Sequence, residues 1–164
     1  MVFNIKKQTG KLVMQVFLPY ENYKDSAEVL DPRRRNKQIL ECVQIAKAIL
    51  GMSESWRNHC VTRMWDACPK GLVLFGLELC KIYKFENRKH HKSKNELTKL
   101  LHYCCQNGYD NNYPKWLGIP KIHMYYQQHL KSKDELFYNF FDVEPISGYW
   151  ALNKHYEWQL YSVK

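Results

Sequence analysis

"LDPRRRNKQILECVQ", residues 30–44, combines the signals of a helix start, a buried face and a charged face. Asp31 suits the N-cap, and Pro32 suits the first helical position because its missing N–H needs no partner there. We expect this helix to continue to Leu50 and to end at Gly51. Apolar residues recur at helical spacing and predict a core-facing side made of Ile39, Cys42, Val43, Ala46, Ile49 and Leu50.

The same helix carries a polar stripe in which cations precede a single glutamate. The stripe consists of Arg34, Lys37, Gln38, Glu41 and Gln44. One interpretation is a solvated face, on which a pair such as Lys37 and Glu41 adds roughly a few tenths of a kcal/mol. The other is an anion site, where phosphates meet the arginines and the helix N-terminus. A deeper carboxylate could then stabilise an oxocarbenium-like centre or move protons while a sugar–base bond is cleaved.

The remaining sequence predicts a mostly α, single compact domain over residues 1–164 with a small N-terminal β-hairpin. Residues 2–18 predict that hairpin, with two short strands on either side of "QTG". The tail, residues 147–164, alternates enough to indicate a strand or an extended cover. Two further helices are expected to begin after N-caps at Asp25 and Asn58. Pro69 either kinks the helix that follows Asn58 or begins a new one. Two more helical stretches are expected, one over residues 93–108 and one over residues 119–141, the latter as one broken helix or two successive helices.

Composition narrows the class of protein. A formal net charge of +9 favours an anionic partner, most simply nucleic acid, although a basic surface that only aids solubility gives the same number. No membrane-length apolar run or signal-peptide core is visible, so we expect no membrane partner and a cytoplasmic location. The six cysteines form no CxxC pair, so we expect neither a metal nor another cofactor. We also expect a monomer.

Five motifs in a fixed order resemble the pyrimidine-dimer DNA glycosylases of the phage endonuclease V type, in particular their short bacterial and phage branch. That branch reads approximately F-L-P-Y, L-D-x-x-R-L-x-K-Q-x-x-E-x-x-Q-I, N-H-P-x-x-R-M-W, P-x-x-H and K-D. Here the corresponding stretches are "FLPY" at 17–20, "LDPRRRNKQILECVQI" at 30–45, "NHCVTRMW" at 58–65, "PKIH" at 120–123 and "KD" at 133–134. The chain departs from the branch at Arg35, where leucine is usual, at Cys60, where proline is usual, and at Tyr126, where a second histidine is common.

The resemblance implies a helical enzyme that binds duplex DNA, flips out a base and attacks C1′ of the damaged nucleotide with its N-terminal amine. The resulting Schiff base then permits strand cleavage by β-elimination. Glu41 matches the family's catalytic glutamate, Arg34 matches a phosphate-contacting residue, and His59 matches the histidine that opens the next helix. The location implied is the cytoplasm of a bacterium or of a host cell, with a phage or other viral origin open.

The candidate site residues fall into three groups. Catalytic candidates are Glu41, His59 and His123; phosphate-binding candidates are Arg33, Arg34, Lys37, Gln38 and Arg63; base-stacking candidates are Tyr125 and Tyr126. Each has a structural alternative. A histidine at a helix start often bonds only to backbone, and the two tyrosines are as well suited to packing.

The front of the chain separates possible mechanisms. Residues 1–13 form an extension before a glycosylase-like domain at 14–164, and Met14 lies near the place where related chains begin. The N-terminal amine could therefore lie far from Glu41, in which case a water molecule would attack and Glu41 would be the base. Three functions remain open: a DNA glycosylase with or without lyase activity, a non-catalytic DNA-binding protein, and an N-glycosidase acting on a free nucleotide or a nucleotide-derived signal.

Overall fold

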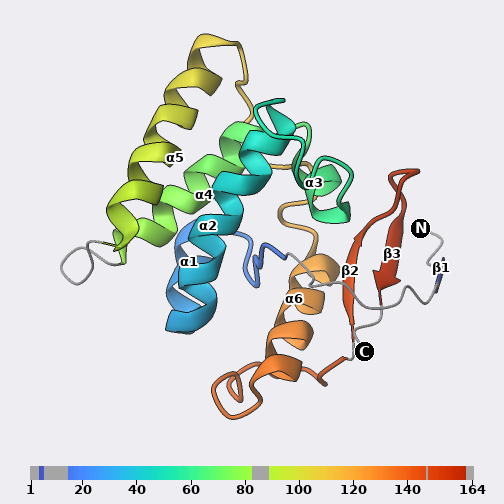
Figure 1. Cartoon of the computed structure of the whole chain (residues 1–164). Helices are drawn as coiled ribbons and strands as arrows, with labels where there is room; N and C mark the ends of the chain where they lie inside the picture. The colour runs from blue at the N-terminus through green and yellow to red at the C-terminus, as the bar shows by residue number, and fades with distance from the viewer. Residues whose placement is uncertain (1–3, 6–14, 83–88, 147, 162–164) are drawn as a thin grey trace.

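The computed structural model describes residues 4–5, 15–82, 89–146 and 148–161. The mostly α architecture is confirmed: six helices and three short strands occupy these residues (Figure 1). None of the described helices is long and apolar enough to span a membrane. The elements are β1 (Asn4–Ile5), α1 (Tyr23–Val29), α2 (Pro32–Ile49), α3 (Cys60–Trp65), α4 (Pro69–Lys81), α5 (Lys89–Gln106), α6 (Pro120–Lys133), β2 (Tyr149–Leu152) and β3 (Trp158–Tyr161).

Helix α2 forms as its sequence predicts. The Asp31 carboxylate accepts a hydrogen bond from the backbone N–H of Arg34 at 3.1 Å, and Pro32 begins the helix. Leu50 caps the C-terminal end, and Gly51 follows with a φ of +72°, a conformation that glycine adopts without strain. Of the predicted apolar face, Ile39, Cys42, Val43 and Ala46 are buried and Ile49 and Leu50 are partly buried, and α2 packs against α3, α4 and α5.

The starts of two other helices and the end of a third differ from the prediction. Asn22, not Asp25, caps α1, because its side chain accepts from the Asp25 N–H at 2.7 Å. His59, not Asn58, caps α3. The last expected helix is a single helix that ends at Lys133, because residues 134–141 form turns instead. Pro69 begins a new helix, which settles the alternative that the sequence left open.

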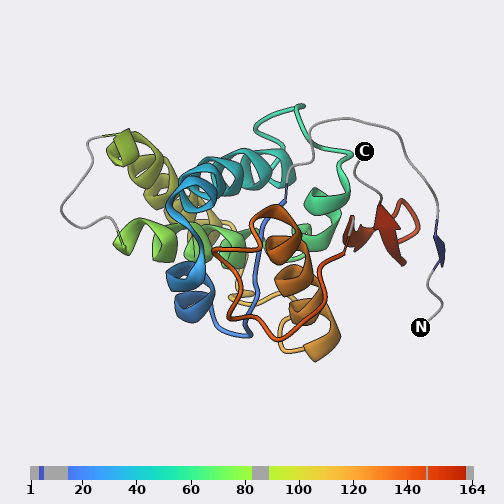
Figure 2. The same cartoon turned by 90° about the horizontal axis from the view of Figure 1, so that it is seen from below.

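Helices α2, α4 and α5 pack into one group, while α6 and the C-terminal strands lie on the other side of α2 (Figure 1, Figure 2). Gly76 permits the closest approach within the group. A Cβ built there would lie 3.0 Å from Cys42 on α2 and from Leu97 on α5, so a larger residue would separate these helices. The largest fully buried side chains include Trp65, Phe75, Ile39, Ile45, Leu72, Leu79 and Leu97.

The predicted N-terminal hairpin is corrected. Strand β1 pairs in parallel with β3, with Asn4 opposite Gln159, while β3 pairs antiparallel with β2. The tail therefore forms strands as expected, but the hairpin is C-terminal. Residues 15–18 are not a strand, because side chains take up their backbone groups instead; the expected "QTG" turn lies outside the described residues.

A short extended segment, residues 15–19, runs between α2 and α6 and is held by both helices (Figure 1, Figure 2). On the α2 side, the buried Gln38 amide accepts from the Phe17 N–H at 3.1 Å and donates to the Gln15 carbonyl at 3.4 Å. On the α6 side, the Leu18 carbonyl contacts His123 at 2.7 Å. Side-chain amides and an imidazole thus replace a neighbouring strand.

We expect Gln38→Leu to lower the free energy of unfolding by about 2–3 kcal/mol. Leucine fills similar space but leaves the buried N–H of Phe17 and the carbonyl of Gln15 without their partner. Urea unfolding measures the loss. Gln44→Leu, a half-buried change on the same helix, is the control, and an equal loss in both variants would contradict the assigned role.

Candidate active site

Glu41 is a buried carboxylate at the inner end of the polar stripe on α2. Only 4% of the residue is exposed. Its Oε1 atom lies 3.4 Å from Nζ of Lys37, and it accepts a hydrogen bond from the backbone N–H of Gln15. Burial raises the pKa of Glu41 to about 7, against the opposing influence of Lys37 and of the Gln15 N–H. The carboxyl group can therefore either accept or donate a proton near neutral pH.

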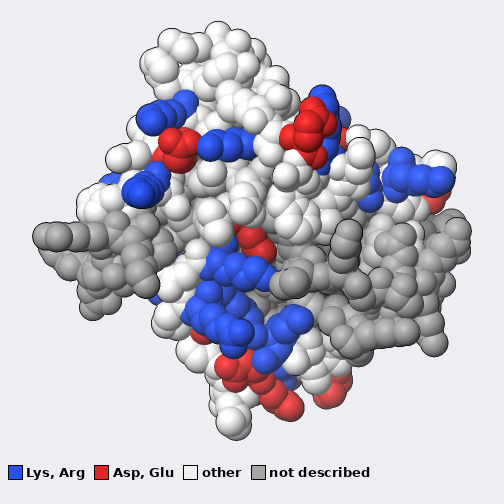
Figure 3. Space-filling view, viewed as in Figure 1, with Lys and Arg blue, Asp and Glu red and all other residues white. Residues whose placement is uncertain are grey.

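Two further cations lie close to Lys37, the side chain that contacts this carboxylate. Lys37 contacts Glu41 directly, Arg34 lies one turn earlier on α2, and Lys133 comes from the last turn of α6. Partial burial and the positive charges of Arg34 and Lys37 lower the pKa of Lys133, which places the three cations close together. Figure 3 shows Lys and Arg side chains massed on the face that includes the start of α2 and the end of α6. We call these three residues the cation cluster.

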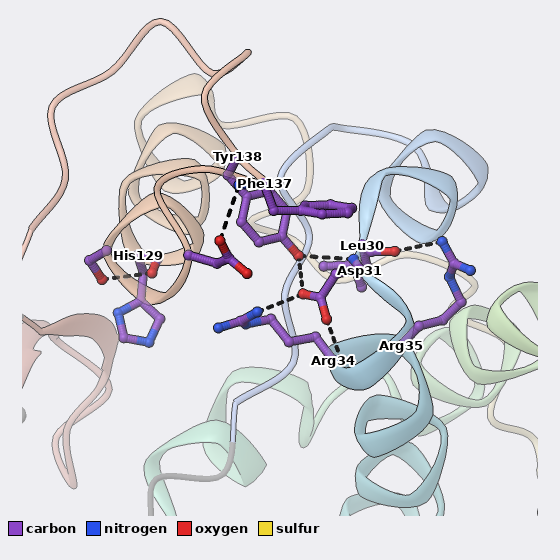
Figure 4. A network of polar contacts seen from close by, with 9 residues as sticks. Leu30, Asp31, Arg34, Arg35, His129, Phe137 and Tyr138 are labelled. Carbon is purple, nitrogen blue, oxygen red and sulfur yellow. Dashed lines mark hydrogen bonds and ion pairs between the residues drawn. The ribbon is translucent and has the colours of Figure 1, made fainter.

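Arg34 is fixed within the cluster by a polar network (Figure 4). Its guanidinium donates to the Asp31 carboxylate at 2.6 Å, and Tyr138 donates to the same carboxylate at 2.6 Å. The Arg34 guanidinium carbon also lies 5.6 Å from the centre of the Tyr138 ring. Burial alone would raise the pKa of Asp31, but the hydrogen bonds from Tyr138 and Arg34 hold it below its usual value. The network keeps Asp31 ionised and Arg34 oriented.

His129 separates the cation cluster from the core. Burial, together with the positive charges of Lys133 and Arg34, lowers the pKa of His129 to about 4. The imidazole is therefore neutral at physiological pH, and it stacks on the Phe17 ring with centroids 5.3 Å apart. A neutral ring at this place lets Phe17 pack without adding a fourth positive charge.

The structure places Lys37 against Glu41 and Arg34 against Asp31, and it gives Gln38 a different role from the predicted one. Arg33 is exposed at the start of α2 and can reach an anion there. Gln38 is 1% exposed, and its amide holds residues 15–17, so it cannot contact phosphate. We therefore replace Gln38 by Lys133 in the phosphate-binding set.

The two predicted catalytic histidines both bond to backbone. His123 donates from Nδ1 to the Leu18 carbonyl and accepts the Gly118 N–H on Nε2 at 2.9 Å, so both ring nitrogens are engaged. His59 accepts the Val61 N–H at 3.2 Å as the N-cap of α3. Burial lowers the pKa of His59, assisted by the charge of Arg63. Each histidine positions a segment of the chain.

Arg63 and the two predicted base-stacking tyrosines pack within the fold. Arg63 donates to the carbonyls of Leu152 at 3.1 Å and Asn58 at 2.6 Å, which ties β2 to the loop before α3. Tyr126 is 3% exposed in the core, so it cannot stack on a base. Tyr125 is half-buried and already stacks on Trp150 with centroids 4.7 Å apart.

Arg35, where the family branch usually has leucine, is also explained by its contacts. Its guanidinium donates to the carbonyls of Ala27, Glu28 and Leu30, which end α1 without partners of their own. Sequence reasoning missed three site residues: Gln15, Lys133 and Tyr138. The "KD" motif at 133–134 was the one available signal for Lys133.

A pocket lies away from the cation cluster and has the wrong charge for a phosphate. It is an open pocket of about 370 Å³ between the 19–22 loop and the start of α6. Its lining includes the acids Glu21 and Asp25 but neither Lys nor Arg. Within the described part of the chain, no group of three or more His, Cys, Asp or Glu side chains is placed to hold a metal ion.

Comparison with known proteins agrees with the arrangement around α2. The model of the pyrimidine dimer DNA glycosylase family matches residues 14–96, just over half of the chain, and this span includes Gln15, the cations of α2 and Glu41. No curated protein and no solved structure matches. The chain belongs to the pyrimidine dimer DNA glycosylase family.

Proposed function

We propose that this protein is a DNA glycosylase that cleaves the N-glycosidic bond of a damaged or modified pyrimidine, with Glu41 as its catalytic carboxylate. One observation carries the proposal: a buried carboxyl group whose pKa is raised to about 7 contacts Lys37, which lies close to Lys133 within the cation cluster. A protein that only binds DNA gains nothing from a carboxylate there, because it would repel the phosphates. A glycosylase needs both a phosphate site and a proton acceptor.

The chemistry follows from these positions. The Glu41 carboxylate takes a proton from water, and the water oxygen forms a bond to C1′ of the nucleotide. The C1′–N1 bond breaks, its electron pair goes to the pyrimidine, and the proton then passes to that base. While the bond breaks, the sugar carries positive charge, which the same carboxylate stabilises. The products are the freed base and a sugar with a hydroxyl group at C1′.

Lys37 and Lys133 supply the mobile part of the phosphate site. The Lys37 side chain is 56% exposed, so its ammonium group can turn from Glu41 to a phosphate when DNA arrives. This movement uncovers the carboxylate and removes a charge that lowers its pKa. Arg34 stays in place because Asp31 and Tyr138 hold it.

The nitrogen of Gln15 bears on whether the reaction is hydrolytic. The backbone N–H of Gln15 donates to Glu41. In the amine mechanism of the family, the nucleophilic nitrogen would have to lie in this position beside the glutamate. In a chain that carries residues 1–14, this nitrogen is an amide and cannot attack C1′. We therefore assign the attack to water in the full chain, with strand cleavage left out of the proposed activity.

We expect Glu41→Gln to reduce N-glycosidic cleavage in a duplex carrying a cyclobutane pyrimidine dimer, measured as alkali-labile abasic sites because the dimer keeps the cleaved base tethered, by at least about a thousandfold, with binding unchanged or tighter. Glutamine keeps the shape of the side chain but cannot take up a proton. For the wild-type protein, kcat/KM should rise with pH and level off above about 7, because the carboxylate form is active and the pKa of Glu41 is raised to about 7.

Duplexes with modified pyrimidines and the matching free nucleotides form a parallel panel in the same assay. Full activity of Glu41→Gln on any of them would refute the assignment of Glu41. Cleavage of the free nucleotides but of none of the duplexes would show that the substrate is a nucleotide and not DNA.

The cation cluster predicts how binding depends on salt. Lys37→Ala and Lys133→Ala should each weaken binding to duplexes of any sequence and reduce the slope of log K against log[salt] by roughly 0.9 for each lost phosphate contact. Lys47→Ala is the control, because Lys47 is paired with Glu96 at 2.8 Å near the other end of α2. If the slope is unchanged in both test variants, the polar stripe of α2 is a solvated surface and not a phosphate site. Fluorescence anisotropy at several salt concentrations measures the slope.

A further inference from the structure

The segment that follows α6 exposes an unusual group of apolar side chains. Leu136 is 89% exposed, Phe140 52% and Phe137 43%, while Tyr138 and Phe141 between them are buried. Three large apolar side chains therefore project into solvent from eight residues of turn, 134–141. Such a projection costs solubility unless something covers it.

The base of this segment is firmly attached to the helices. The Tyr138 hydroxyl bonds to both the carboxylate and the backbone N–H of Asp31, and its ring stacks on Phe141 at 5.7 Å between centroids. Lys131 donates to the carbonyls of Phe141 at 2.9 Å and Val143 at 3.0 Å. The exposed side chains thus stand on a fixed platform, so little conformational entropy remains to be lost when they bind.

The platform is joined directly to the cation cluster. Tyr138 shares the Asp31 carboxylate with Arg34, as Figure 4 shows, and Lys133 immediately precedes the segment. An anion held by Arg34 and Lys133 is therefore adjacent to the exposed apolar group. A partner that places phosphates beside flat apolar surfaces matches this combination, and duplex DNA is such a partner.

We propose that Leu136 and Phe140 form an apolar wedge that enters a base step of duplex DNA while the cation cluster holds the neighbouring phosphates. This inference rests on the proposed function and adds to it the means by which the duplex is opened. Side chains of this kind unstack and kink a base step in proteins that deform DNA. Opening the stack next to the cation cluster would free a nucleotide to turn toward Glu41.

The acids around the wedge are consistent with this orientation. Asp134 accepts the Phe137 N–H at 3.1 Å within the segment, and Glu135 and Asp142 are exposed near it. Their carboxylates repel phosphates, so the wedge is directed to the bases and the sugar–phosphate backbone to the cation cluster. A protein partner would instead require a broader apolar surface than these few side chains provide.

The test uses the full-length protein carrying Glu41→Gln, so that the DNA stays intact, and a duplex with 2-aminopurine next to a cyclobutane pyrimidine dimer. Unstacking of 2-aminopurine raises its fluorescence. We expect Leu136→Ala/Phe140→Ala to abolish most of the rise and to weaken binding about tenfold, as loss of base stacking would. The salt slope should not change, because no phosphate contact is lost.

Met52→Ala is the matched control. Met52 is 45% exposed after the C-terminal end of α2, about 27 Å from its start for an 18-residue helix, and its loss should change neither signal. An unchanged fluorescence rise or affinity in the double variant overturns the wedge. In protein that keeps Glu41, N-glycosidic cleavage that is unchanged by Leu136→Ala/Phe140→Ala refutes the wedge alone. Failure of every form to bind duplex DNA refutes both proposals.

Discussion

The contact between Gln38 and residues 15–17 determines the geometry of the whole site. A glutamine side chain on α2 replaces a strand partner, satisfies the buried N–H of Phe17 and fixes the path of the segment before α1. Gln38 and Glu41 are three residues apart and lie on one face of α2, so the same contact delivers the Gln15 N–H to the Glu41 carboxylate. On the opposite side of the segment, Phe17 packs on His129 of α6. The extended segment, residues 15–19, thereby sets the distance between α2 and α6.

Two opposing electrostatic effects meet at Glu41. Burial favours the neutral acid, whereas Lys37 and the Gln15 N–H favour the carboxylate, and burial prevails. The balance is close enough to leave the pKa in the neutral range. The surrounding cations are arranged differently: Arg34 is tied to Asp31 and Tyr138, while the Lys37 ammonium group is exposed on its outer side. A fixed cation beside a mobile one is a suitable arrangement for capturing a phosphate and then exposing the carboxylate.

Sequence patterns predicted the parts of this molecule that depend on local rules. The start of α2 at Asp31 and Pro32, its apolar face and the grouping of Arg34, Lys37 and Glu41 all follow from helical spacing. The pairing of β1 with β3 could not be predicted in this way, because strand pairing between distant segments leaves no local sequence pattern. For the same reason the roles of Gln38, Arg63 and Tyr126 were misassigned: polarity and position within a motif do not reveal that a side chain is already engaged by distant backbone or packed in the core. Lys133 joins the site only because α6 ends beside α2.

The account depends most directly on the nature of the nitrogen that faces Glu41, and borohydride trapping on a dimer-containing duplex reports it. Borohydride reduces a Schiff base between a protein amine and C1′ to a permanent bond. A chain that begins at Met14 carries its amine on the residue directly before Gln15. Consecutive Cα atoms are about 3.8 Å apart, so this amine is close to the Gln15 nitrogen. We predict that the full chain cleaves the N-glycosidic bond, leaving an alkali-labile abasic site, without being trapped, whereas the chain beginning at Met14 is trapped. Efficient trapping of the full chain would contradict the hydrolytic mechanism, and absence of N-glycosidic cleavage by both chains would contradict the assignment of a glycosylase.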